Sequence, residues 1–195
     1  MGRKMQINSL TGQILLATPS LQDRHFRDSV VLVCHHDEEG SMGLIVNRPQ
    51  EVSIIDVLED LQLIPDRNYI AGLPAQRCLS FEGGPVDPYR GFVLHDGWHI
   101  YDSTMQVNPE LHLTTSRDVL EEIAAGSGPE HFMLILGYAG WDASQLEQEL
   151  ANNDWLVAAP NHHLLFQADP EIRWALAAQS MGVSKANLTH QVGHA

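Results

Sequence analysis

The fold of this chain is constrained most by short apolar runs that follow one another across turns too short to hold a helix. The runs 29–36 and 42–48 flank an acidic turn at 37–41, which predicts a β-hairpin. The runs 91–96 and 98–103 flank Gly97 and predict a second hairpin. Because parallel strands need long crossovers, we expect antiparallel pairing and an α+β fold rather than a regular βαβ alternation.

Periodicity and capping residues predict the remaining elements. The run 131–137 is the most apolar and is expected to lie centrally in the sheet. Pro49 is expected to end the strand before it, because it has no N–H to donate to a ladder. Other strands are predicted at 12–18, 78–86, 111–116 and 154–160, and helices at 53–63, 116–126, from the Asp142 cap to Asn152–Asn153, and at 169–182.

Length and composition indicate an ordinary globular protein. The 195 residues are 44% apolar and 18% charged, which suits one domain over 1–195 with loosely packed ends at 1–9 and 184–195. The formal net charge is −14 and no window carries a run of Lys or Arg, so nucleic acids and anionic membranes are disfavoured partners. No apolar run is long enough for a membrane span or a secretory leader, and we expect a cytoplasmic protein.

The stretch "ILGYAGWDASQLEQEL" (135–150) is open to two interpretations. A glycine-rich turn between a strand and a helix is typical of phosphate-binding loops, in which a Lys usually follows. Here no Lys follows, and Asp142 with Gln145 forms a capping-box pattern that uses the free N–H groups itself. We therefore favour a tight strand-to-helix corner in which Gly137 and Gly140 let the backbone turn.

Histidines and cysteines were considered as chemical groups. Of the eleven histidines, those in "HHDEE" (35–39) and "HDGWH" (95–99) could bind a metal, but neither stretch has a metal-binding spacing such as H-E-x-x-H. We expect surface histidines, no metal and no cofactor. Cys34 and Cys78 are expected to be small apolar strand residues, and a reactive thiol at Cys34 beside His35 is the alternative.

The sequence shows no catalytic constellation. It has no G-x-S-x-G elbow, and spacing alone ties no Ser, His and Asp into a triad. The acidic groups at 37–39 and 121–122 resemble a solvated turn and a solvated helix face. We expect no catalytic residues, and the sequence leaves enzymatic activity open while favouring a non-enzymatic protein.

Three turns rich in Gly, Pro and aromatic residues form the candidate contact surface. Glycines let another chain approach closely, and aromatic residues at turns are typical of contact sites. The alternative for each turn is backbone geometry alone. The candidate residues are Asn47, Arg48, Pro49, Gly83, Gly84, Pro85, Gly137, Tyr138, Gly140 and Trp141.

These turns lie in blocks that resemble the AlgH/YqgE family of bacterial proteins. The resemblance runs from Leu10 to Ala195, and the later "DPEIRWALAAQSMGV" and the final "GHA" agree with it. Ala143-Ser144 departs from the small, Gly-containing pair of the family, and "SKANLTHQV" departs from its more apolar ending. The three main blocks are "LTGQILLATPSLQDRHFRDSVVLVCHHDEEGSMGLIVNRP" (10–49), "FEGGPVDPYRGFVLH" (81–95) and "LILGYAGWDASQLEQELANNDWL" (134–156).

The resemblance implies an α+β fold with a bifurcated β-sheet, part of which closes into a small barrel, surrounded by helices. It implies no established activity. The family is called a transcriptional regulator by name but carries no recognised DNA-binding motif, so no functional residue is carried over.

Three functions are expected in order. The first is a cytosolic, non-enzymatic protein that acts through contacts with a protein partner, with an indirect regulatory role. The second is a small-molecule-binding protein or enzyme whose pocket forms where the three turns meet. The third is a DNA-binding regulator. The sequence specifies neither the partner nor the oligomeric state.

Overall fold

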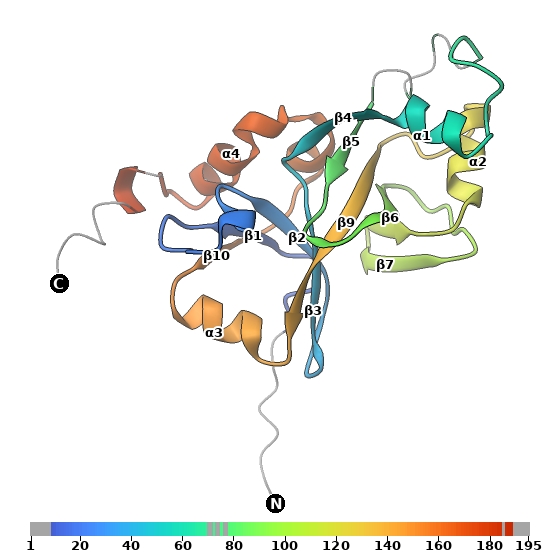
Figure 1. Cartoon of the computed structure of the whole chain (residues 1–195). Coiled ribbons are helices and arrows are strands. Elements are labelled where there is room, and N and C mark those ends of the chain that lie inside the picture. The colour runs from blue at the N-terminus through green and yellow to red at the C-terminus, as the bar shows by residue number, and fades with distance from the viewer. Residues whose placement is uncertain (1–8, 70–71, 73–74, 76–77, 185, 189–195) are drawn as a thin grey trace, which may run out of the picture.

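The computed structural model describes residues 9–69, 72, 75, 78–184 and 186–188 (Figure 1). The strands in this part of the chain are β1 (Ile14–Ala17), β2 (Val30–Asp37), β3 (Gly40–Ile45), β4 (Pro49–Ser53), β5 (Leu79–Glu82), β6 (Val86–His95), β7 (Thr104–Asn108), β8 (Leu111–Thr114), β9 (Phe132–Asp142) and β10 (Trp155–Ala158). The α-helices are α1 (Ile54–Asp60), α2 (Asp118–Ala125), α3 (Gln145–Ala151) and α4 (Arg173–Ser180), with short helical segments η1 (Arg24–Phe26), η3 (His163–Gln167) and η4 (Pro170–Ile172). No helix among these residues combines the length and the apolar character that a membrane crossing requires.

Strand β9 is the axis of the sheet. The strand order is β10-β1-β2-β3-β9-β6-β8-β7, with every neighbouring pair antiparallel. The first part of β9 pairs with β6 on one edge and, in parallel, with β5 on the other, whereas residues 139–142 pair with β3. Because β5 and β3 follow each other along one edge of β9, the sheet divides there. It curls into a half-barrel, which confirms the bifurcated α+β fold.

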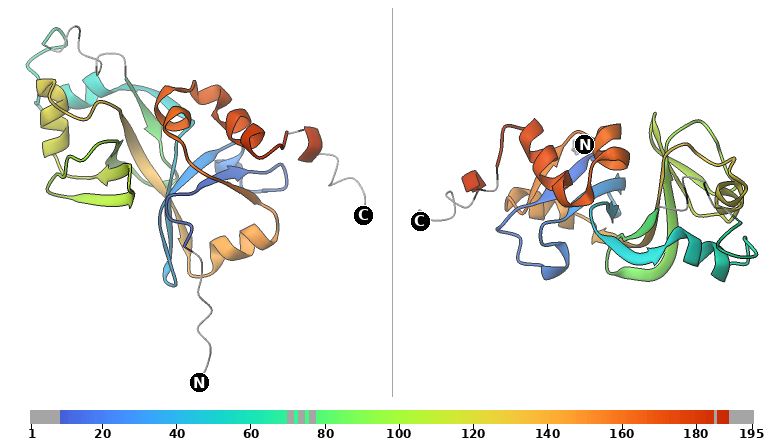
Figure 2. Two further views of the ribbon diagram at one scale, coloured as in Figure 1. Left: turned by 180° about the vertical axis from the view of Figure 1, so that it is seen from behind. Right: turned by 90° about the horizontal axis from the view of Figure 1, so that it is seen from above.

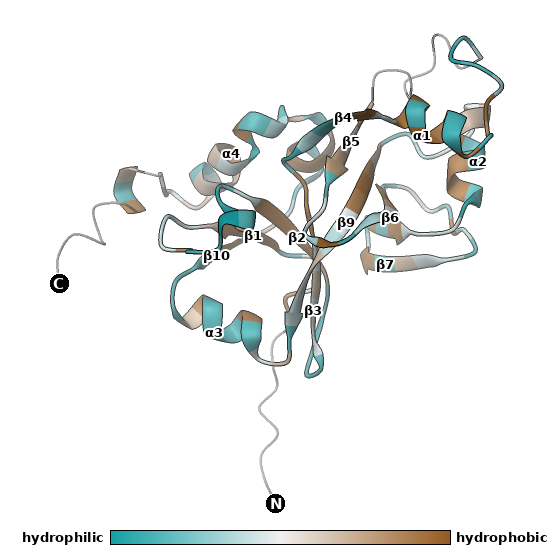
Figure 3. Cartoon of the chain, viewed as in Figure 1, coloured by the Kyte–Doolittle hydropathy of each residue, from teal (hydrophilic) through white to brown (hydrophobic). Residues whose placement is uncertain are grey.

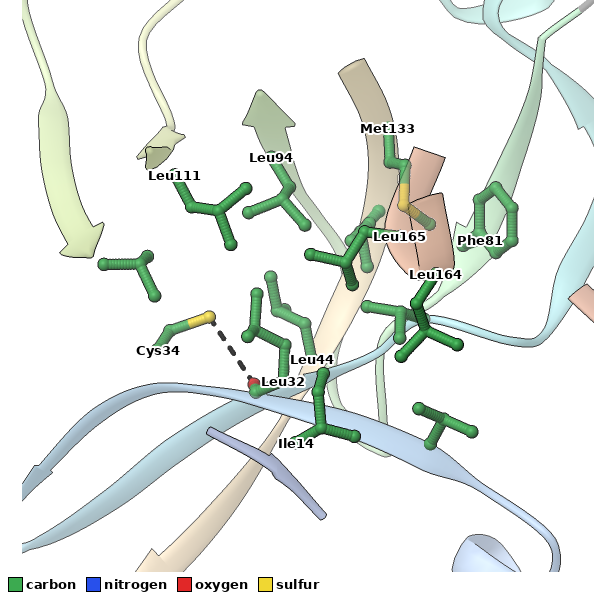
Figure 4. Close-up of a cluster of buried hydrophobic side chains, with 14 of the residues drawn as sticks. Ile14, Leu32, Cys34, Leu44, Phe81, Leu94, Leu111, Met133, Leu164 and Leu165 are labelled. Atoms are coloured by element: carbon green, nitrogen blue, oxygen red, sulfur yellow. Dashed lines mark hydrogen bonds between the residues drawn. The ribbon is translucent and has the colours of Figure 1, made fainter. Parts of the chain in front are cut away.

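Helices cover the two halves of the sheet separately. Helices α3 and α4 lie with β1, β2 and β10, whereas α1 and α2 lie with β6, β7 and β8 (Figures 1 and 2). Apolar residues concentrate along the strands (Figure 3). The largest core joins the two halves of the sheet to η3 and α4, and it contains Leu32, Leu94 and Leu165 (Figure 4). Smaller cores lie against α1 and α2, and against α3.

Several local predictions are confirmed. Strands β2 and β3 form the first predicted hairpin, and the 131–137 run lies in the centre of the sheet as part of β9. Ser53 begins α1 with a capping box: its hydroxyl accepts the N–H of Asp56, whose carboxylate accepts the N–H of Ser53. Asp169 accepts the N–H of Glu171 ahead of α4, as expected.

The second predicted hairpin is wrong. Strand β6 pairs with β8 and β9, residues 98–103 contain no strand, and the hairpin forms between β7 and β8 instead. Trp98 and Ile100 are 83% and 80% exposed, so the apolar residues in this stretch do not face a core. Apolar alternation here comes from an exposed loop, not from a half-buried strand.

The predicted turn at 137–141 is also wrong, because β9 continues through it to Asp142. Gly137 takes φ +75°, which bends the strand between its pairing with β6 and its pairing with β3. Helix α3 begins later than expected, with Ser144 at the N-cap position, so the Asp142 cap is wrong too. Only half of the capping box forms: the Gln145 side chain accepts the N–H of Asp142.

Candidate functional site

Two of the three predicted contact turns meet in a close backbone crossing. The N–H of Gly83 donates to the carbonyl of Leu136 (2.8 Å), and the carbonyl of Gly83 accepts the N–H of Ile45 (2.9 Å). A Cβ at Gly83 would overlap the carbonyl oxygen of Gly137, and a Cβ at Gly84 would overlap β9 in the same way. The crossing therefore holds β3, β5 and β9 together, and it leaves room for glycine only.

The third turn ties this crossing to the segment before β2. The Asn47 side chain accepts the N–H of Val30 (2.8 Å) and donates to the carbonyl of Asp28 (3.0 Å). Pro49 begins β4, so the expectation that it ends a strand is wrong; the first residue of a strand tolerates a missing N–H. Asn47 thus acts as a clamp between two chain segments.

Arg48 braces the same region. Its guanidinium donates to the carbonyls of His25 and Arg27 and lies 3.7 Å from the carboxylate of Glu82. The Arg48 carbonyl accepts the N–H of Glu82 (2.9 Å). The three turns are therefore brought together in space.

The aromatic residues of the 137–141 stretch pack inward. Tyr138 is half-buried and lies edge-on to Phe92, with ring centroids 6.0 Å apart. Trp141 is 5% exposed, and its indole N–H donates to Glu149. Pro85 and Gly140 are exposed. The cavities described below have other linings, and a contact role for the ten residues stays a prediction.

A different face carries an open cavity of about 740 Å³. We call it the Trp98 face, formed by Trp98, Ile100, Gln106, Pro109 and Glu110 around this cavity. A second cavity, of about 320 Å³, lies between α1, α2 and β9. Sequence reasoning missed the Trp98 face because it assigned this loop to a strand.

Three titratable side chains converge at one side of the larger cavity. Asp96 follows β6, His131 precedes β9 and His162 precedes η3. The Oδ2 atom of Asp96 accepts from Nδ1 of His131 (2.8 Å) and from Nε2 of His162 (3.0 Å). Burial opposes ionisation of Asp96, but hydrogen bonds from His162 and His131 outweigh it and lower the pKa of the carboxyl. The sequence spacing gave no sign of this cluster, because its members come from three distant segments.

Two buried histidines support the wall of this cavity. His95 is held at both ring nitrogens, by the carbonyl of Asp96 (3.0 Å) and by the hydroxyl of Thr114 (2.9 Å), and burial lowers its pKa. His112 stacks on His95 with ring centroids 5.7 Å apart and lines the cavity. Among the described residues, Nδ1 of His112 is buried and has no hydrogen-bond partner.

The other groups considered from the sequence lie apart from this cavity. His35 pairs with Asp37 on the surface, whereas His36 is buried and bonds to Glu147. Cys34 lies in the largest core beside the carbonyl of Leu32, and burial raises the pKa of its thiol to about 12 (Figure 4). At neutral pH this thiol is protonated, so Cys34 is a packing residue rather than a reactive one.

Comparison with known proteins places the chain among relatives of nearly its own length. The family model described as AlgH-like matches residues 14–186. A UPF0301 protein of Xanthomonas oryzae pv. oryzae is 45% identical over 186 residues, which cover 95% of this chain and 96% of the relative. A UPF0301 protein of Shewanella frigidimarina is 41% identical over 189 residues, covering 97% and 100%.

Solved structures agree with this result. The solution structure of the AlgH protein from Pseudomonas aeruginosa matches with a TM-score of 0.77 and 41% identity over the whole of both chains. A crystal structure of a Corynebacterium diphtheriae protein matches with a TM-score of 0.72 and 20% identity over 96% and 94%, which shows a shared fold. Since the family model spans most of the chain and full-length relatives exceed 40% identity, the chain belongs to the AlgH-like family.

Proposed function

We propose that this protein is a non-enzymatic binding protein that holds a protein partner on the Trp98 face. The observation that supports the proposal is the exposure of two large apolar side chains, Trp98 and Ile100, at the rim of a 740 Å³ cavity. Tryptophan is enriched among the residues that dominate binding energy at protein interfaces. A neighbouring cavity gives a partner side chain a place to insert.

The loop that presents Trp98 is anchored to the protein. The N–H of Tyr101 donates to the hydroxyl of Thr104 (2.8 Å), and the buried Tyr101 phenol donates to Glu122 (3.0 Å). Burial and the negative charge of Glu122 raise the pKa of Tyr101, which keeps the phenol protonated as a donor. The His99 ring lies between Trp98 and Tyr101, with centroids 4.8 and 6.2 Å away. An anchored loop loses less conformational entropy when a partner binds.

Charge indicates the chemistry of the partner. Arg117 is the only Lys or Arg in the sequence between residues 91 and 172, and acidic residues are spread throughout that stretch. Glu110 lies at the rim of the cavity itself. We expect a partner segment that combines basic and apolar residues, and association that slows as ionic strength rises.

The proposal predicts that the double variant Trp98→Ala/Ile100→Ala loses its partner. Removing a central tryptophan anchor costs about 2–4 kcal/mol of binding free energy, or roughly 30-fold or more in affinity. The measurement is quantitative affinity capture from cells that make the protein, with wild type and variant side by side. Tyr89→Ala is the matched control, because Tyr89 is 97% exposed but lies at the smaller cavity.

We expect wild type and Tyr89→Ala to enrich the same protein, and the double variant to lose it. Size-exclusion chromatography of each protein separates this result from self-association. An identical set of captured proteins for all three would contradict the proposal.

A further inference from the structure

We propose that Asp96, His131 and His162 form a binding site for one Zn²⁺ ion. Two imidazole nitrogens and one carboxylate oxygen from these residues all lie within 4.8 Å of one another. Zinc is bound by this combination of ligand types in open sites, where solvent or a ligand takes the fourth position. The site is separate from the proposed partner binding, and either can exist without the other.

The carboxylate of Asp96 is held in position by the backbone. Its Oδ1 atom accepts the N–H of His131 (3.1 Å), and the N–H of Asp96 donates to the carbonyl of His131 (3.1 Å). These two bonds extend the pairing of β6 with β9 by one residue beyond His95 and Phe132. They leave Oδ2 facing the two rings. A ligand whose second oxygen is already fixed is oriented before an ion arrives.

The imidazole rings are also constrained. His131 and His162 meet edge to face with centroids 4.5 Å apart, and Phe166 lies 5.0 Å from the ring of His162. All three ligand residues are partly buried. Rings held in this way lose little freedom on coordination, which favours binding.

The present distances are close to those that an ion needs. Ligand atoms around a tetrahedral zinc ion at about 2.0–2.1 Å lie roughly 3.3 Å apart. Oδ2 of Asp96 therefore has to separate from both nitrogens by a few tenths of an ångström. In each neutral ring the proton moves to the other nitrogen, so that the nitrogen facing Oδ2 offers its lone pair to the ion.

The cavity supplies the open side of the site. Asp96 and His162 both line it, and so does His112, which is 8% exposed. A buried nitrogen without a partner, such as Nδ1 of His112, costs free energy that a bound water or ligand can recover. The unpartnered ring beside the three ligands is a second sign that this wall of the cavity is built to hold something polar.

The test is a zinc titration of untagged protein that has been stripped with a chelator, in competition with a chromophoric zinc indicator. We expect one equivalent to bind to wild type. His131→Ala and His162→Ala each remove a ligand and should weaken binding by at least about tenfold. His163→Ala is the matched control, because His163 is the exposed neighbour of His162 and contacts Gln167 instead.

Two further readouts separate loss of a ligand from loss of the fold. Zn²⁺ should raise the Tm of wild type and of His163→Ala but not that of His162→Ala. Co²⁺ should give visible absorption bands in wild type that disappear in His131→Ala. Circular dichroism with excess chelator checks that each variant folds. Absence of binding to wild type, or equal binding by all variants, would overturn the proposal and assign any zinc to scattered surface histidines.

Discussion

Gly83→Ala is expected to lower the Tm by about 10 °C, or to prevent the protein from folding. A Cβ at this position would overlap the carbonyl oxygen of Gly137 and press on Cγ2 of Ile135. The backbone cannot move aside, because Gly83 is hydrogen bonded to Leu136 on one side and to Ile45 on the other. Forced overlap in a packed interior costs about 1–3 kcal/mol or more, and about 3 kcal/mol lowers the Tm of a chain this size by roughly 6–12 °C.

Gly140→Ala is the control for this prediction. Gly140 lies on β9 three residues beyond Gly137, but a Cβ there meets nothing closer than the Tyr138 ring at 3.7 Å. We expect its Tm to stay within a few degrees of wild type, as measured by circular dichroism or calorimetry. Equal losses for Gly83→Ala and Gly140→Ala would mean that the crossing is not the specific cause.

Glu149→Ala is the second change with a large expected effect. One carboxylate oxygen of Glu149 accepts both indole N–H groups, from Trp141 (2.9 Å) and from Trp155 (2.8 Å). Both indoles are at least 95% buried, so alanine would leave two donors without partners. Each unsatisfied buried donor costs about 1–3 kcal/mol, which gives a loss of roughly 2–5 kcal/mol in the free energy of unfolding.

Two variants isolate the cause of this loss. Glu149→Gln keeps an oxygen that can accept from the indoles, so it should retain most of the stability. Gln148→Ala changes an exposed neighbour on the same helix and should be close to neutral. Denaturant unfolding followed by tryptophan fluorescence measures all three. A loss in Glu149→Gln as large as in Glu149→Ala would show that the charge, and not the acceptor oxygen, stabilises the indole pair.

The sequence predicts those parts of the fold that depend on local patterns. The β2–β3 hairpin follows from a short turn between apolar runs, and the start of α1 follows from the capping residues of Ser53 and Asp56. The sharing of β9 between β3, β5 and β6 could not be predicted, because it depends on pairings between distant segments. Gly137 resembled a turn in the sequence, yet its positive φ bends a strand that continues.

The candidate site shows the same limit. The glycines at 83, 84 and 137 mark a place where backbones approach closely, and the close neighbour is another strand of the same chain. The cluster of Asp96, His131 and His162 joins three segments that no spacing rule connects. Trp98 could have been found from its sequence, because an apolar residue next to a glycine suits an exposed loop as well as a strand.

The most direct test of the proposed function is site-specific photo-crosslinking in cells that make the protein. A photoreactive amino acid at Gln106, which lines the cavity, samples the Trp98 face and leaves Trp98 and Ile100 intact. The same amino acid at Val157, on β10 in the other half of the sheet, is the control. The account predicts a defined protein adduct from position 106 that disappears when Trp98→Ala is added, and none from position 157. An adduct that forms equally from both positions, or no adduct from position 106, would contradict it.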